Sequence, residues 1–417
     1  MIQTTVLSNG IRIVTDSSDM TDSVTLGVWV SVGARYETAE INGISHMLEH
    51  MAFKGTTTRS SFDISKEIED VGGMINAYTG KDMTAYYVRV LKENQDLGFD
   101  IISDIVQHSI MDETELEKEK GVIIQEINMQ NDTPDDLVFD YYASVAYPEQ
   151  PLGRAILGTA DTVRSISSSN LLDYMHTQYT ADRMIISASG AVNHEDFVAA
   201  CEKKLIHIST HKMPSAVSAI YTGGEKRVLK PHEQVNLVLG FEGLNYNHPD
   251  YYTGSVLSVI LGGGMSSRLF QEIREKRGLV YSIYAFNSPE RDTGTFGIYA
   301  GTGEDEVAEL MPVLCDELLR LPHTLTEEEI NRAKAQLKAS VLMRMENISG
   351  RARMNAVDMI IHERIVPKQE VIDKINTIEK QDLERVALTI LKGKPTFSAL
   401  GPISKVMSYE EIVQRLK

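Results

Sequence analysis

Residues 24–51 read VTLGVWVSVGARYETAEINGISHMLEHM, and this stretch decides the predicted fold. The alternation over residues 24–32 predicts a β-strand. The segment GARY at 33–36 follows as a loop. The residues from 44 to 54 predict a helix that stops at Gly55, because glycine is favoured where a helix ends. The stretch is therefore a strand, a loop and a helix.

The same order of elements recurs in the second half of the chain. Residues 235–261 read VNLVLGFEGLNYNHPDYYTGSVLSVIL, and GLNY at 243–246 falls on GARY at 33–36. Three polar residues of the first helix then fall on apolar residues of the second copy: His46 on Val256, Glu49 on Val259 and His50 on Ile260. The chain is thus predicted to be a duplication in which one copy kept a polar site and the other kept only the packing.

The predicted fold class is α+β, with two duplicated domains that each hold a mainly antiparallel sheet packed with helices. A chain of 417 residues is too long for one hydrophobic core. Loose Ser-, Thr-, Pro- and Gly-containing sequence predicts a linker at 209–224, between domains at 1–208 and 225–417. In the first domain we expect a hairpin turning at Asn9-Gly10, strands at 74–79, 84–91 and 184–189, and helices at 62–71, 95–109, 113–130 and 195–205.

Composition and charge exclude several classes of protein. The net charge of −18 argues against nucleic acid as a partner, because phosphate binding requires basic patches. No apolar run approaches the roughly 18 residues that suggest a membrane span, and the N-terminus lacks the basic start and apolar block of a signal peptide. Cys201 and Cys315 are too few for a disulfide framework and are expected to be buried free thiols. A cytoplasmic protein is predicted.

The pentad HMLEH at residues 46–50 carries the candidate chemistry. On a helix that turns by about 100° per residue, positions i, i+3 and i+4 share one face, so His46, Glu49 and His50 point the same way. Two imidazoles can then hold one metal ion while the carboxylate lies beside an ion-bound water. The alternative is a solvated or internally satisfied helix face, but H-x-x-E-H is a known zinc-site order.

A catalytic zinc ion usually takes three protein ligands, and the helix predicted at 113–130 offers the third. Glu119 and Glu126 are two helical turns apart and share one face. Taken alone, a solvated, charge-rich helix face explains this pair better than a metal site does. Glu126, however, lies in the apolar stretch 122–127, where an unpaired carboxylate would be costly. This favours Glu126 as the ligand and Glu119 as a carboxylate that orients an imidazole.

The pentad and the residues MAFKGT that follow it resemble the pitrilysin/insulinase family of zinc peptidases. Within that family the chain is similar to bacterial relatives of the catalytic (beta) subunit of the mitochondrial processing peptidase. The resemblance covers the whole chain and implies two similar α+β domains and one Zn²⁺ per chain, held by His46, His50 and Glu126. The family's third ligand has the spacing that separates Glu126 from His50. The resemblance further implies that Glu49 and Glu119 are the catalytic carboxylates.

Two further segments are similar to substrate-binding elements of the family. GGMINA, which ends at Ala77, is similar to an edge strand on which a substrate peptide adds as a β-strand, with Asn76 and Ala77 at the scissile region. REKRGLVY, from Arg274 to Tyr281, is similar to a segment that carries a substrate-binding Arg/Tyr pair. Without the resemblance, Asn76 would be an ordinary strand-end residue, and Arg274 a basic helix end next to a core tyrosine.

The sequence favours a zinc-dependent endopeptidase that hydrolyses unfolded peptides, captured as an added β-strand in an enclosed chamber. One alternative is a processing peptidase specific for basic leader segments, and another is a non-catalytic peptide-binding or scaffold subunit. The intact pentad argues against the scaffold. The glycine run after Leu261 is shorter than the glycine-rich loop of non-catalytic subunits. Family members with four domains enclose the substrate, so this chain is expected to do so as a homodimer.

Overall fold

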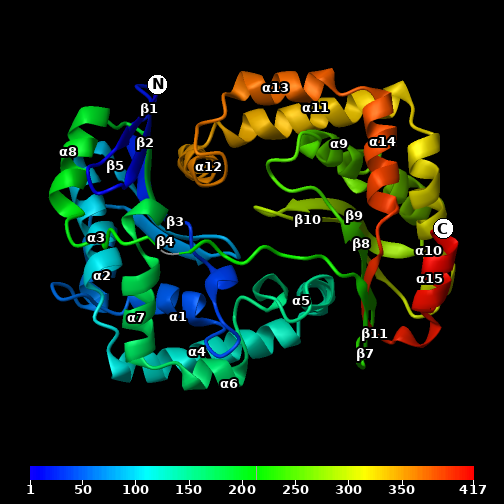
Figure 1. Ribbon diagram of the computed structural model, residues 1–417, viewed down its shortest axis with the longest axis horizontal. Coiled ribbons are helices and arrows are strands. Elements are labelled where there is room, and N and C mark those ends of the chain that lie inside the picture. The colour runs from blue at the N-terminus through cyan, green and yellow to red at the C-terminus, as the bar shows by residue number, and fades with distance from the viewer. Residues whose placement is uncertain (213) are drawn as a thin grey trace. The chain divides into compact units, whose positions relative to one another are not determined.

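The computed structural model describes residues 1–212 and 214–417, so residue 213 of the predicted linker lies outside the described part. The described residues pack into two compact units, each built on its own sheet (Figure 1). Neither unit is continuous in sequence. The first contains Met1–Asn128, Ala155–Val217 and Met343–Ile365, and the second contains Met129–Arg154, Ser218–Leu342 and Val366–Lys417.

The sheet of the first unit is mixed and has the strand order β1-β2-β6-β3-β5-β4. Its strands are β1 (Ile2–Val6), β2 (Arg12–Ser17), β3 (Ser23–Val30), β4 (Met74–Thr79), β5 (Thr84–Leu91) and β6 (Met184–Gly190). β2 and β6 run parallel, and the other neighbouring pairs are antiparallel. β3 lies inside the sheet and is buried on both faces from Val24 onward, whereas β4 forms an edge.

The sheet of the second unit has the order β7-β11-β8-β10-β9. Its strands are β7 (Gly224–Leu229), β8 (Val235–Glu242), β9 (Val280–Pro289), β10 (Gly294–Thr302) and β11 (Thr396–Gly401). β7 and β11 run parallel and the other pairs are antiparallel. Apart from β1, this repeats the first sheet strand for strand and direction for direction. The predicted α+β duplication is confirmed, with β8 in the position of β3 and β9 in that of β4.

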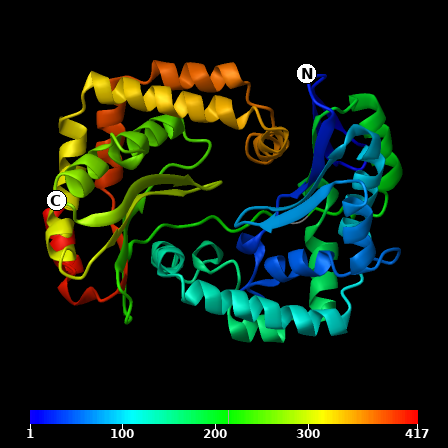
Figure 2. The same ribbon diagram turned by 180° about the vertical axis from the view of Figure 1, so that it is seen from behind.

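Helices cover both sheets. Those of the first unit are α1 (Ile44–Ala52), α2 (Ser61–Glu69), α3 (Gln95–His108), α4 (Glu113–Asn131, which runs on into the second unit), α6 (Ala160–Ser165), α7 (Ser168–Gln178), α8 (His194–Lys204) and α12 (Ile348–Ile361). Those of the second are α5 (Pro134–Ala146), α9 (Tyr251–Gly262), α10 (Val307–Arg320), α11 (Glu327–Arg344), α13 (Lys368–Thr377), α14 (Lys380–Leu391) and α15 (Tyr409–Arg415). Figure 2 shows α3, in lighter blue, against the strands of the first sheet.

The two halves of the chain exchange a helix. α12, from the second half, packs on β2, β3 and β6 of the first unit. Its buried residues Ala352, Ala356, Met359 and Ile360 contact Val14, Trp29, Ala85 and Ile185. Because successive strand residues face opposite sides of a sheet, α12 covers the face away from the main core. Conversely, α5 from the first half packs on β7, β8 and β11. The continuous ranges 1–208 and 225–417 therefore do not coincide with the packing units.

Two expectations drawn from the composition, on membrane spans and on the cysteines, can be compared with the structure. No helix within the described residues is both long enough and apolar enough to cross a bilayer. Cys201 and Cys315 are both buried and free. The thiols therefore act as small apolar side chains of the two cores.

Ala356→Glu should destabilise the first unit, although residue 356 lies in the second half of the sequence. Ala356 is 0% exposed and belongs to the same buried cluster as Trp29. An unpaired charge buried there lowers the free energy of unfolding by about 3–5 kcal/mol. Trp29 is the single tryptophan of the chain, so its fluorescence during urea unfolding reports on this unit, and the midpoint should fall. Ala199→Glu, at an exposed position of α8, is the control. Equal midpoints for both variants would contradict the packing of α12.

Candidate metal centre

Helix α1 separates an apolar face from a polar face. The apolar side chains belong to the core of the first unit and are at most 1% exposed: Ile44, Met47, Leu48 and Met51. His46, Glu49 and His50 lie on the other side and are partly exposed. Burying each large apolar side chain is worth roughly 1.5–3 kcal/mol. The core therefore fixes the direction in which the three polar side chains point.

The buried carboxylate of Glu37 fixes the start of α1. One of its oxygens accepts hydrogen bonds from Asn42 Nδ2 and from the Gly43 N–H, each at 2.8 Å, and the other accepts the Ser45 N–H at 2.9 Å. Gly43 has a φ of 98°, and a Cβ there would lie 2.8 Å from the carbonyl oxygen of Leu157, so glycine is required. A negative charge at this end also stabilises the helix dipole. Burial raises the pKa of Glu37, although these hydrogen bonds oppose the rise.

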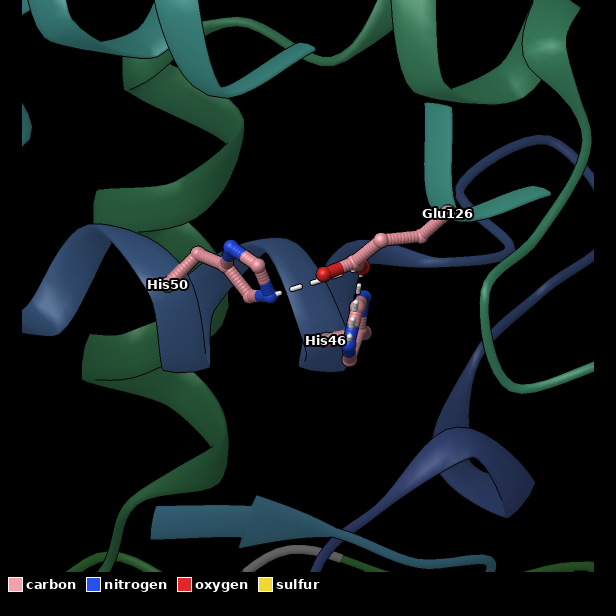
Figure 3. Close-up of side chains that lie close together, drawn as sticks. All are labelled: His46, His50 and Glu126. Atoms are coloured by element: carbon pink, nitrogen blue, oxygen red, sulfur yellow. Dashed lines mark ion pairs between the residues drawn. The ribbon is translucent and has the colours of Figure 1, made fainter. Parts of the chain in front are cut away.

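Helix α4 brings Glu126 to both histidines (Figure 3). Glu126 Oε2 lies 3.8 Å from His46 Nε2 and 3.7 Å from His50 Nε2. Two ligands about 2.0–2.1 Å from a tetrahedral zinc ion are about 3.3 Å apart, so a small relaxation brings these atoms to ligand spacing. Among the described residues, no other trio of His, Cys, Asp or Glu side chains converges in this way.

The donor set also fits a metal ion chemically. His46 turns its Nε2 towards Glu126, while its Nδ1 is buried without a hydrogen-bond partner in the described chain. Burial, with a contribution from the charge on His50, lowers the pKa of His46 to about 4. His50 Nδ1 faces a carboxylate, which can only accept, so in the neutral ring Nδ1 carries the proton and Nε2 is free. Metal ions bind neutral imidazoles through such free nitrogens. His46, His50 and Glu126 therefore fit a zinc ion.

Glu119 anchors the ring of His50. Its side chain is 8% exposed, and its two oxygens have different partners: Oε2 lies 2.9 Å from His50 Nδ1 and Oε1 lies 2.6 Å from Lys54 Nζ. Burial acts to raise the pKa of Glu119, but the hydrogen bonds from Lys54 and His50 act against it and the net pKa is lowered. The carboxylate therefore stays ionised and can orient the imidazole.

Glu49 lies on the polar face of α1 but is not one of the converging ligands. The Thr79 hydroxyl donates a hydrogen bond to Glu49 Oε2 at 2.5 Å. Burial raises the pKa of Glu49, while the bond from Thr79 opposes this. A carboxylate whose pKa is raised towards neutrality is a stronger proton acceptor than an exposed one.

Edge strand β4 carries Asn76 and Ala77. The Ala77 N–H donates a hydrogen bond to Asn76 Oδ1 at 2.8 Å, so this backbone donor lies on the open side of the strand and not against β5. Thr79 shares a strand face with Ala77, because side chains two residues apart point the same way. The open edge of β4 thus leads to the threonine that contacts Glu49.

Arg274 and Tyr281 belong to the second unit, where two irregular backbone features frame them. Arg274 lies in a π-helical turn, Phe270–Glu275, a rare form that is frequent at functional sites. Its guanidinium lies 4.8 Å from the centre of the Phe270 ring and 5.7 Å from that of Tyr281. The register between β9 and β10 shifts at Tyr281, which is the extra residue of a β-bulge. Tyr281 is 76% exposed.

Four residues that contact the candidate site residues or fix the helix that carries them were not identified from the sequence: Glu37, Lys54, Thr79 and Phe270. Glu37 and Lys54 flank the pentad closely, so the acidic residue before the helix and the basic one after it were available signals. Thr79 offers only its position three residues after Asn76 on one strand. Phe270 is one of many apolar residues in its region, and nothing local distinguishes it.

Two family models match the chain. The model described as Insulinase (Peptidase family M16) matches residues 12–160, which include the pentad and Glu126. The model described as Peptidase M16 inactive domain matches residues 165–337, which run from the last elements of the first unit into the second copy of the repeat. The two models follow the asymmetry seen in the sequence, with the polar trio in the first copy alone.

Curated relatives extend this similarity to the whole chain. An uncharacterized zinc protease of Rickettsia felis is 39% identical over 95% of this chain and 96% of its own length. The beta subunit of the mouse mitochondrial-processing peptidase is 32% identical over 100% of this chain and 87% of its own length.

Solved structures share the fold. A protease from Helicobacter pylori has a TM-score of 0.89 at 22% identity, over 96% of this chain and 99% of its own. A chain of complex III2 from Candida albicans has a TM-score of 0.88 at 20% identity, over 100% of both chains. With relatives this similar over nearly its full length, the chain belongs to the M16, or insulinase, family of metallopeptidases and is close to the beta subunits of mitochondrial-processing peptidases.

Proposed function

We propose that the protein is a zinc-dependent endopeptidase that hydrolyses unfolded peptides. The observation that carries this proposal is the convergence of His46, His50 and Glu126 beside Glu49, whose carboxylate is not among the ligands. A scaffold protein has no need for two histidines whose Nε2 atoms face the same carboxylate. Zinc protease names among the relatives also support the proposal.

Each polar residue of the centre receives a role. His46, His50 and Glu126 would hold one zinc ion per chain, which when bound polarises the scissile carbonyl and lowers the pKa of water. Glu49 accepts the proton of that water and passes it to the leaving amine. Thr79 holds the Glu49 carboxylate by its 2.5 Å hydrogen bond. Glu119 keeps His50 in the tautomer that leaves Nε2 free.

The proposed mode of substrate capture is strand addition to β4. An exposed edge strand offers backbone donors and acceptors to an extended peptide, and the Ala77 N–H is such a donor. Because this N–H now binds Asn76 Oδ1, the amide of Asn76 must turn away as the peptide adds, and it is then free to bind the peptide itself. Recognition through backbone atoms suits unfolded peptides of varied sequence. The proposed location of the protein is the cytoplasm.

The proposed assembly is a homodimer in which Arg274 and Tyr281 of one chain serve the zinc site of the other. The irregular backbone around the pair and the 76% exposure of Tyr281 leave it available to a substrate. Arg274, whose guanidinium lies near the rings of Phe270 and Tyr281, offers planar donors for carbonyl groups. A symmetric dimer would carry two such composite sites.

Two other functions remain to be separated from this one. A processing peptidase would make one cut in basic leader peptides, and the similarity to processing-peptidase subunits favours that test. A peptide-binding scaffold would bind without cleaving. Product analysis on leader and random peptides, with and without chelator, distinguishes all three.

Glu49→Gln should leave zinc binding intact and lower kcat by about 100- to 10,000-fold, because an amide cannot accept a proton near neutral pH. The measurement is turnover of an unstructured fluorogenic peptide together with zinc content by mass spectrometry. Near wild-type turnover by zinc-loaded Glu49→Gln would remove Glu49 from the mechanism.

Glu126→Gln should lower zinc occupancy more than Glu119→Gln does. The first change removes a charged ligand, whereas loss of a carboxylate that orients a ligand typically costs about 10- to 100-fold in affinity or activity. Equilibrium dialysis against buffered zinc gives the dissociation constants. Glu115→Gln, at the start of the same helix, is the matched control. If all four proteins bind zinc equally, the third ligand lies elsewhere.

Mixing two inactive variants tests the shared site. A Glu49→Gln chain and an Arg274→Ala, Tyr281→Phe chain should each be nearly inactive alone. In a mixed dimer, one site combines an intact zinc centre with an intact Arg/Tyr pair, so activity should return to as much as about a quarter of wild type when half the dimers are mixed and each has one working site. Heterodimers detected by native mass spectrometry but without recovered activity would mean that both residues act within their own chain or not at all.

A further inference from the structure

Lys54 contacts the metal centre through one intermediate residue. Its Nζ lies 2.6 Å from Glu119 Oε1, and Glu119 Oε2 lies 2.9 Å from His50 Nδ1. Each oxygen of this carboxylate therefore has its own partner. A carboxylate held at one oxygen alone can still rotate, whereas one held at both presents a fixed lone pair to the imidazole.

The Lys54–Glu119 pair differs from an ordinary surface ion pair. Exposed pairs contribute about 0–1 kcal/mol because solvent screens them. The Glu119 side chain is only 8% exposed and that of Lys54 is 29% exposed, so water does little to replace the lysine. Without Lys54, the buried charge of Glu119 would have His50 as its remaining hydrogen-bond partner, at a cost in free energy.

The backbone that carries Lys54 is itself fixed. The Lys54 N–H donates to the Met51 carbonyl at 3.0 Å, which ties the residue to the end of α1. Gly55 follows with a φ of 131°, a conformation that favours glycine. The chain then meets Asp104, which is 7% exposed and accepts hydrogen bonds from the hydroxyls of Thr56 at 2.6 Å and Thr58 at 2.7 Å.

We propose that Lys54 is a positioning residue for the metal centre, which holds the Glu119 carboxylate so that it fixes the orientation of His50 towards the ion. This inference rests on the proposed zinc site. Lys54 touches neither the ion nor a substrate, so its effect appears in how firmly the metal is held. The hydrogen bonds of the loop to Asp104 and the two contacts of Glu119 thus form a connected series from Asp104 to His50.

Zinc release is the direct test. Zinc-loaded full-length protein is mixed with excess chromogenic chelator, and the release rate is followed. Lys54→Met should release zinc about 3- to 10-fold faster than wild type, somewhat less than the effect of losing a carboxylate that contacts the ligand directly. Lys54→Arg keeps a charged donor and should recover at least part of the wild-type rate. Lys118→Met is the matched control, because Lys118 pairs with the exposed start of α4 at Glu115, and its rate should equal that of wild type.

A double variant separates positioning from a general loss of stability. If Lys54 acts through Glu119, then adding Lys54→Met to Glu119→Gln should change the release rate by less than about 2-fold, because residues in one network are not additive. Full additivity, or a Lys54→Met rate equal to that of wild type, would overturn the inference. If Trp29 fluorescence shows that Lys54→Met is unfolded, Lys54→Gln takes its place under the same criteria. A wild-type protein that binds no zinc would overturn the proposed function, and this inference with it.

Discussion

Burial of the apolar face of α1 is the interaction on which the metal centre depends. Met47 and Met51 are 0% exposed, so a rotation of the helix about its axis would bring them into water at a cost of a few kcal/mol. The hydrogen bonds that Glu37 accepts from the Gly43 and Ser45 N–H groups fix the position of the first turn of the helix. Residues without a chemical role therefore set the direction in which the metal ligands point. The interactions of the ligands themselves need to supply little of the folding free energy.

The second unit shows what the fold requires without the metal centre. Its sheet repeats the first strand for strand, and α9 follows β8 as α1 follows β3. When residues 24–51 are aligned with residues 235–261, His46 and His50 correspond to Val256 and Ile260, which are 0% and 4% exposed. Apolar residues at these positions are thus compatible with the same architecture. The polar trio is an addition to the packing of the first copy and not a condition for it.

The sequence predicted what depends on local pattern. The predicted strands at 74–79 and 84–91 and the predicted helix start at 113 agree with β4, β5 and α4. The structure adds the cap of α4, where the Asp112 carboxylate accepts the Glu115 N–H. The polar face of α1 follows from helical period alone. The contacts of Lys54 with Glu119 and of Thr79 with Glu49 join distant segments and leave no periodic trace. The exchange of α5 and α12 was also invisible, because an amphipathic helix does not record which sheet it covers.

The second unit has two irregular backbone features that strand β4 and the helix before it, α2, lack. β4 pairs with β5 in unbroken register, whereas β9 has a bulge at Tyr281 and follows a π-helical turn that carries Arg274. Both features cost regular hydrogen bonds, and each turns a side chain away from its regular position. The packing of the core does not call for either, since the first unit closes without them. Both irregular features lie in the copy that lacks the polar trio. They therefore favour a role for Arg274 and Tyr281 at a site other than a metal centre.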